Sequence, residues 1–127
     1  MSPVAGFLAT VLICEDEPAL RELVRLSLDG QYEFEEAEDG MGCLERAREV
    51  LPDLIVLDMM LPGLTGLEVL SELRRDPQLA AVPVIVLTAQ PATRDDALRA
   101  GANLVMDKPF NVDDISAAVK EVLAGSP

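Results

Sequence analysis

Five short apolar stretches recur along the chain, and each is followed by a segment in which apolar residues have helical spacing. The stretches predict strands at residues 10–14, 34–37, 54–57, 84–87 and 104–106. Three of them are apolar throughout, as expected for strands buried on both faces of a parallel sheet. The pattern therefore predicts an α/β domain built from five strand–helix units.

Two of the segments between the strands carry an apolar stripe that can pack on a sheet. The first stripe consists of Leu20, Leu23, Val24 and Leu28, and the second of Leu67, Leu70 and Leu73. Because connections between parallel strands are almost always right-handed, five strands and five helices predict a doubly wound sheet. We expect one domain over residues 10–124, an N-terminal extension over residues 1–9 and a C-terminal tail over residues 125–127.

Residues with strong preferences for helix ends support this assignment. Pro18 suits a first helical turn, and Asp39 can cap the second helix. Asn111 and Asp114 have the spacing of a capping box before the last helix. Gly101 follows a helical segment and is expected to end it.

The chain has 127 residues, and its 23 acidic and 10 basic residues give a net charge of -13. This charge repels both nucleic acid and anionic lipid, so we expect no direct DNA binding and no membrane association. The apolar run that ends at Cys14 is too short to span a bilayer and has no basic residue before it, which favours a cytoplasmic location. Cys14 and Cys43 lack a CxxC spacing and the chain has no histidine, so both are interpreted as reduced core or half-buried residues, in preference to a disulfide or a reactive thiol.

Polar residues capable of metal binding or catalysis lie just after four of the predicted strands. They are Glu15 and Asp16, Asp58, Thr88, and Lys108. In a doubly wound sheet the carboxyl ends of the strands form the ligand-binding edge, so these side chains are expected to converge there. Each taken singly suits a helix cap or a turn, but clustered carboxylates need a compensating cation. An all-oxygen ligand set without histidine favours Mg²⁺, with a phosphoryl group supplying further oxygens.

The motifs around these residues resemble the receiver domains of two-component response regulators. They are Glu15-Asp16, the segment 52–66, Thr88-Ala89 and Lys108-Pro109-Phe110. The similarity extends over about residues 10–124. It implies a flavodoxin-like, doubly wound, five-stranded parallel sheet of order 2-1-3-4-5 with five helices.

The resemblance also implies a function and a role for each candidate residue. Asp58 would accept a phosphoryl group from a sensor histidine kinase or histidine phosphotransferase, while Thr88 and Lys108 contact the phosphoryl oxygens. The Mg²⁺ ligands that it implies are Glu15, Asp16, Asp58 and the backbone carbonyl of Met60. Such a domain is a signalling switch, not an enzyme with a separate substrate, and it acts on a downstream protein target or output domain. A homodimer through the last helix–strand–helix face remains an open alternative.

Two features depart from the usual receiver pattern. Val105 occupies a position at which many receivers carry an aromatic residue or histidine that moves with the threonine. Met60 and Gln90 occupy variable positions near the path of the hydrolytic water, and neither is a carboxylate or a strong base. We hypothesise slow self-dephosphorylation, with simple loop packing of Met60 as the alternative.

Three other functions are compatible with parts of this pattern. A haloacid-type phosphohydrolase requires a second aspartate at position 60, which is Met60. An FMN-binding flavodoxin is disfavoured by an aromatic content of 3% and by the acidic loop after the first strand. The stronger rival is an interaction module with the same fold that no longer accepts phosphate, and phosphorylation with a small donor separates it from a working receiver.

Overall fold

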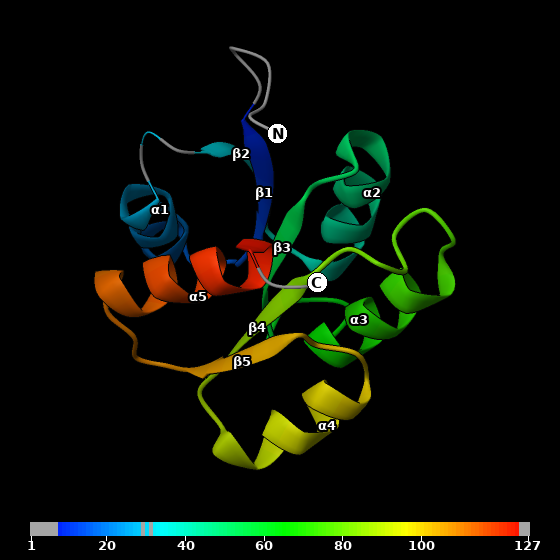
Figure 1. Cartoon of the computed structure of the whole chain (residues 1–127). Coiled ribbons are helices and arrows are strands. Elements are labelled where there is room, and N and C mark those ends of the chain that lie inside the picture. The colour runs from blue at the N-terminus through cyan, green and yellow to red at the C-terminus, as the bar shows by residue number, and fades with distance from the viewer. Residues whose placement is uncertain (1–7, 29, 31, 125–127) are drawn as a thin grey trace.

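In the computed structural model, five parallel strands form one sheet in the order β2-β1-β3-β4-β5 (Figure 1). The strands are β1 (Ala9–Cys14), β2 (Tyr32–Ala37), β3 (Leu54–Asp58), β4 (Val84–Thr88) and β5 (Leu104–Asp107). The helices are α1 (Pro18–Ser27), α2 (Gly40–Val50), α3 (Gly66–Arg75), α4 (Arg94–Arg99) and α5 (Val112–Ala124), and a short 3₁₀ turn, η1 (Pro91–Thr93), precedes α4. The predicted fold class and strand order are confirmed.

The structure describes residues 8–28, 30 and 32–124. Except for Leu8 and Ala9, the predicted N-terminal extension lies outside the described residues, as does the predicted tail over residues 125–127. Among the described residues, no helix combines the length and the hydropathy needed to span a bilayer.

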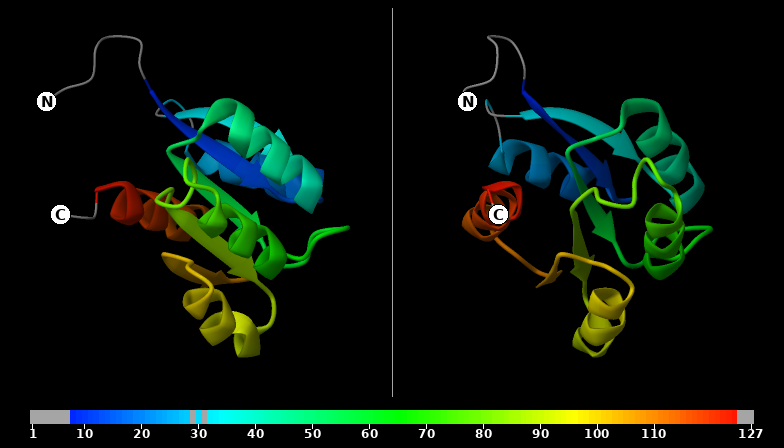
Figure 2. Two further views of the ribbon diagram at one scale, coloured as in Figure 1. Left: turned by 90° about the vertical axis from the view of Figure 1, so that its right-hand side faces the viewer. Right: turned by 45° about the vertical axis from the view of Figure 1, so that its right-hand side comes forward.

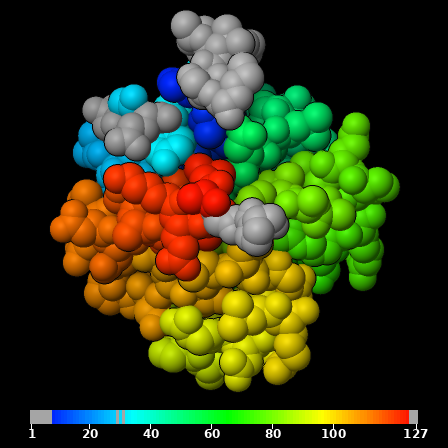
Figure 3. Space-filling model, viewed as in Figure 1, coloured from blue at the N-terminus to red at the C-terminus, as the bar shows by residue number. Residues whose placement is uncertain are grey.

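The sheet is the middle layer of three, with α1 and α5 on one face and α2, α3 and α4 on the other (Figure 2). Figure 3 shows α5, coloured orange to red, lying across the first of these faces. A hydrophobic core lies on each face of the sheet, and alternate residues of β3 pack into one core or the other. Ile55 and Leu57 pack on the side of α2 and α3, whereas Leu54 and Val56 pack on the side of α1 and α5. This burial on both faces explains why β3 is apolar until its last residue.

The predicted helix ends are confirmed by their hydrogen bonds. The carboxylate of Asp39 accepts the backbone N–H of Gly42 at 2.6 Å and caps α2. Asn111 and Asp114 form the reciprocal capping box before α5, in which the Asp114 N–H donates to Asn111 Oδ1 at 2.9 Å. Gly101 ends α4 with a φ of 113°, a backbone conformation that side chains with a Cβ rarely adopt.

Cys14 and Cys43 are both buried, as expected, but the prediction that they are reduced is wrong, because they form a disulfide. Cys14 is the last residue of β1 and Cys43 lies in α2, and their Cα atoms are 5.8 Å apart. The two residues are 29 positions apart, and only the packing of α2 on the sheet brings them together. The spacing rules applied to the sequence detect local cysteine motifs and carry no signal for such a pair.

Candidate functional site

The strands place the predicted site residues at one edge of the sheet. Asp58 is the last residue of β3 and Thr88 the last of β4, while Glu15 directly follows β1 and Lys108 directly follows β5. The backbone N–H of Lys108 donates to the carbonyl of Thr88 at 2.7 Å, which joins the last two loops. Parallel pairing therefore brings these four residues to the carboxyl edge of the sheet, as the sequence predicts.

Three carboxylates form a tight cluster at this edge. One oxygen from each of Glu15, Asp16 and Asp58 can be chosen so that all three lie within 4.8 Å of one another. Glu15 and Asp58 are buried, with 1% and 3% of their surface exposed, whereas Asp16 is exposed. Backbone N–H groups support the buried pair, since Glu17 donates to Glu15 Oε2 at 3.1 Å and Met60 donates to Asp58 Oδ1 at 3.2 Å.

Lys108 is the cation of the cluster. Its Nζ lies 3.0 Å from Asp58 Oδ1 and 3.2 Å from Glu15 Oε1. Burial acts to lower the pKa of Lys108, but its contacts with Asp58 and Glu15 outweigh that effect and raise the pKa above its usual value. Burial also raises the pKa of Glu15 to about 7, and the negative charge of Asp58 contributes to this rise. Ionising Glu15 is therefore costly while Lys108 alone balances the cluster.

The residues of the cluster fit a hard divalent cation. When all are ionised, three carboxylates and one ammonium leave an excess of two negative charges. The donors are all oxygens, which suit Mg²⁺ or Ca²⁺ and not a soft metal. Because Asp16 is exposed, the cluster opens to solvent and can admit an ion that keeps several of its waters, as Mg²⁺ does.

Thr88 is buried, and its hydroxyl is hydrogen-bonded to the loop between β4 and α4. Its Oγ1 lies 2.8 Å from Thr93 Oγ1 and 3.1 Å from the carbonyl of Gln90, and it accepts the Gln90 N–H at 3.0 Å. The side chain of Met60 is 63% exposed. The contact of the Thr88 hydroxyl with a phosphoryl oxygen stays a prediction. The same holds for the binding of Mg²⁺ by the Met60 carbonyl.

The sequence analysis did not single out Arg21, which is hydrogen-bonded to the loop that follows β1. Its Nη1 donates to the carbonyl of Glu15 at 2.7 Å, and its Nε pairs with Glu36 at 2.8 Å. Arg21 lies one helical turn after Glu17, so its proximity to the loop could have been inferred from helix geometry. The Lys108–Pro109 peptide bond is cis, which the sequence analysis did not predict.

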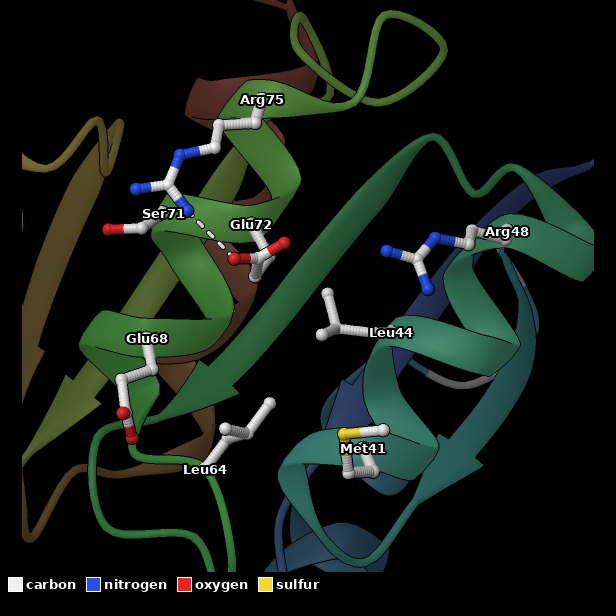
Figure 4. Close-up of a pocket in the computed structure, with 8 residues that line it drawn as sticks. All are labelled: Met41, Leu44, Arg48, Leu64, Glu68, Ser71, Glu72 and Arg75. Carbon is white, nitrogen blue, oxygen red and sulfur yellow. Dashed lines mark hydrogen bonds and ion pairs between the residues drawn. The ribbon is translucent and has the colours of Figure 1, made fainter.

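The hollows near these elements include one between α2 and α3 and a smaller one beside Lys108. The hollow between α2 and α3 measures about 460 Å³ and is shown in Figure 4 with the Arg75–Glu72 ion pair on its rim. None of the residues lining it belongs to the acidic cluster. A smaller hollow of about 350 Å³ includes Lys108 and is otherwise apolar, lined by Leu20, Leu23, Ala89, Pro109 and Phe110.

The sequence matches the response regulator receiver domain over residues 11–120. The chain belongs to this family. The acidic cluster of Glu15, Asp16 and Asp58 is typical of the phosphorylation site of a receiver domain. Receiver domains act in two-component signalling, typically as switches and not as enzymes.

Individual relatives agree with the family assignment. The receiver is 38% identical over 116 residues to the DNA-binding dual master transcriptional regulator RpaA of Synechocystis sp., a match that covers 89% of this chain and 48% of RpaA. Its fold matches the chemotaxis response regulator CheY4 of Vibrio cholerae, with a TM-score of 0.86, 30% identity, and coverage of 91% of this chain and 99% of that one. The receiver domain of NtrX from Brucella abortus gives a TM-score of 0.84 at 30% identity, covering 91% and 99% of the two chains. The chain spans about half the length of curated relatives such as RpaA.

Proposed function

We propose that this receiver domain accepts a phosphoryl group on Asp58 and signals through the resulting change in its surface. The observation that carries the proposal is the contact of Lys108 with Asp58 at 3.0 Å inside the carboxylate cluster. A carboxylate attacks phosphorus without a general base, so a site without histidine is sufficient for this reaction. The domain turns over no separate substrate, and its chemistry is limited to its own phosphorylation and dephosphorylation.

The proposed roles divide the site into a metal side and a phosphoryl side. Glu15, Asp16, Asp58 and the Met60 carbonyl would hold Mg²⁺, which supplies positive charge next to the transferring phosphoryl group. Lys108 would contact a phosphoryl oxygen from the opposite side, because its ammonium already lies within hydrogen-bond distance of Asp58. Thr88 would donate its hydroxyl to another phosphoryl oxygen after leaving its partners in the β4–α4 loop.

We propose a sensor histidine kinase or a histidine phosphotransferase as the phosphoryl donor. The apolar hollow beside Lys108 supports this, since it offers a docking surface on α1 and the β5–α5 loop next to the nucleophile. The signal would pass to a downstream protein target or output domain in the cytoplasm. The net charge of -13 supports a receiver that does not itself bind DNA, with residues 10–124 as the functional domain.

Incubation with acetyl phosphate and Mg²⁺, followed by mass measurement, tests the proposal. The wild type should gain the mass of one phosphoryl group, and Asp58→Asn should gain none. Asp95→Asn is the matched control, because Asp95 is an exposed aspartate in α4 outside the cluster, and it should be phosphorylated like the wild type. Chelation of Mg²⁺ should prevent the reaction in the wild type and in Asp95→Asn.

Two results would contradict the proposal. Full labelling of Asp58→Asn would place the phosphoryl group on another residue. A wild type that gains no mass would favour the rival function, an interaction module that recognises its partner without phosphorylation.

A further inference from the structure

The hydroxyl of Thr88 is connected to the first residue of α4 through Thr93. Thr88 Oγ1 and Thr93 Oγ1 are 2.8 Å apart, and the Thr93 hydroxyl also lies 2.8 Å from the carbonyl of Gln90. Thr93 is the last residue of η1 and directly precedes Arg94, where α4 begins. A displacement of the Thr88 hydroxyl therefore removes a contact at the start of α4.

Arg94 in turn fastens the start of α4 to β5. Its Nη1 donates to the carbonyl of Val105 at 3.1 Å, and its Nη2 lies 3.0 Å from Asp107 Oδ2. The side chains of Arg94 and Asp107 are 40% and 51% exposed, so water competes with this ion pair and keeps it weak. A contact of this strength can be broken by a modest change in the site.

Both residues proposed to contact the phosphoryl group are adjacent to this Arg94 contact. Thr88 reaches it through Thr93, and Lys108 directly follows Asp107 in the chain. Lys108 is held in the site by Asp58 at 3.0 Å. Thr88 is thus connected to Arg94 through Thr93 at the start of α4, and Lys108 is connected to Arg94 through Asp107 at the end of β5.

Val105 lines a groove together with both residues of the Arg94–Asp107 ion pair. Its side chain is short and buried, and this groove of about 460 Å³ is lined by Val105, Arg94 and Asp107 together with residues of the β5–α5 segment. A β-branched side chain has one stiff rotatable bond and cannot sweep across this groove as a ring can. The guanidinium of Arg94 is the group at this junction that contacts both Val105 and Asp107.

The other end of α4 is anchored more firmly. Two nitrogens of the Arg74 guanidinium donate to the carbonyl of Gly101, Nη2 at 2.7 Å and Nε at 3.2 Å. Arg74 Nη1 also donates to the carbonyl of Val82 at 2.8 Å. These contacts fix the C-terminal end of the six-residue helix to α3 and to the α3–β4 loop. A change at Thr93 and Arg94 is therefore expected to move the N-terminal end of α4 about this anchor.

We propose that Arg94 couples phosphorylation to the α4–β5 face in place of the aromatic residue that Val105 replaces. In the unphosphorylated protein Thr93 holds the hydroxyl of Thr88, and Arg94 holds β5. When the Thr88 hydroxyl turns to the phosphoryl group it leaves Thr93, and the contacts of Arg94 with Val105 and Asp107 are released. This inference rests on the proposed function of Asp58.

Thermodynamic linkage determines whether loss of the Arg94 contacts strengthens or weakens the binding of a phosphoryl group. Contacts that exist only in the unphosphorylated arrangement oppose the phosphorylated one, so removing them raises the fraction of molecules ready to bind a phosphoryl group. An exposed ion pair of this kind corresponds to about a two- to fivefold change in that equilibrium. Arg94→Ala should therefore bind beryllofluoride, a phosphoryl mimic, about two- to fivefold more tightly than the wild type in the presence of Mg²⁺.

Calorimetric titration with beryllofluoride and Mg²⁺ tests this on two matched pairs of variants. Arg99→Ala is the control for Arg94→Ala, because Arg99 lies on the same helix and its ion pair with Asp96 stays within α4. Thr93→Ser is the control for Thr93→Val, because serine keeps the hydroxyl and valine keeps only the shape. Arg94→Ala and Thr93→Val should bind beryllofluoride more tightly, while Arg99→Ala and Thr93→Ser should match the wild type.

Amide exchange distinguishes coupling by Arg94 from a purely structural role of this residue. In the wild type, beryllofluoride should change the exchange of residues 91–99 and 104–107. In Arg94→Ala this change should be smaller, because the ligand-free variant already lacks the contacts of Arg94 that the ligand releases in the wild type. Melting temperatures of all variants confirm that each is folded under the conditions of the titration.

The outcomes separate this inference from the proposed function. If acetyl phosphate labels Asp58 in all variants but Arg94→Ala and Thr93→Val bind beryllofluoride like the wild type, the coupling by Arg94 is wrong and the proposed function stands. Weaker binding by Arg94→Ala would also overturn the coupling, since it would place the contact in the phosphorylated arrangement. A wild type that accepts no phosphoryl group would overturn both.

Discussion

The Nζ of Lys108 lies between two buried carboxylates, 3.0 Å from Asp58 Oδ1 and 3.2 Å from Glu15 Oε1. One ammonium therefore compensates two acidic groups that water does not reach, while Asp16 adds a third charge at the solvent side. A buried charge without a partner is costly, so the stability of this edge depends on how the remaining negative charge is balanced. Three of the predictions below follow from this arrangement.

Added Mg²⁺ should raise the melting temperature of the wild type, because an ion that binds only the folded protein stabilises it by mass action. At a concentration about ten times its Kd, the gain is about 1.4 kcal/mol, or about 5 °C for a domain of this size. Asp16→Asn should lose most of this gain, and Asp95→Asn should keep it. An undiminished rise in Asp16→Asn, measured by calorimetry in chelated and Mg²⁺-loaded buffer, would place the ion elsewhere.

Lys108→Met should destabilise the chelated protein by about 2–3 kcal/mol, because it leaves two buried carboxylates without their ammonium. The same variant should gain more from Mg²⁺ than the wild type does, since the cluster is then more negative. Lys120→Met is the control, because Lys120 is exposed in α5. Equal Mg²⁺-dependent shifts in melting temperature for wild type and Lys108→Met would show that Lys108 does not influence the metal site.

The chelated protein should lose stability as pH rises from about 5 to 8. Burial raises the pKa of Glu15 to about 7, so the folded state holds this proton more tightly than the unfolded state, where the pKa is near 4.5. The protonated Glu15 therefore adds to the free energy of unfolding in full below pH 4.5. This contribution is at most about 3 kcal/mol and is lost as pH rises through about 7. Urea unfolding across this range should show a shallower decline in Glu15→Gln, and an unchanged one in the exposed control Glu17→Gln. A decline just as steep in Glu15→Gln would assign the titration to another group.

Reduction of the Cys14–Cys43 disulfide should lower the stability of the fold. The bond closes a loop of 29 residues, and in the chain-entropy account such a cross-link contributes about 3–4 kcal/mol by restricting the unfolded chain. Reductant should therefore lower the melting temperature of the wild type and leave that of Cys43→Ala unchanged. Maleimide labelling of the denatured, unreduced protein should detect no thiol, and two labelled cysteines would contradict the disulfide.

Local patterns in the sequence determined the architecture and most of the site of this protein. The stretch 54–57 is continuously apolar because β3 is covered on both faces, and that covering requires strand–helix units in a doubly wound sheet. The strand order 2-1-3-4-5 was implied by the resemblance to receiver domains. The caps at Asp39 and Asn111 involve partners only three residues away, so they can be predicted from the sequence without knowledge of the fold. Asp58 and Lys108 were found for a related reason, since parallel strands carry their carboxyl ends to one edge.

Tertiary structure alone decided the contacts between loops that are distant in the chain. The Cys14–Cys43 disulfide depends on how α2 settles on the sheet, and the contact of Arg94 with Asp107 depends on where α4 lies beside β5. The position of the Thr88 hydroxyl on Thr93 likewise follows from the path of the β4–α4 loop. Periodicity and spacing describe which face of an element is buried, but the distance between two side chains on different elements is set by packing. For that reason the sequence identified the candidate residues for the proposed chemistry, and the folded structure decided which contacts hold those residues in place.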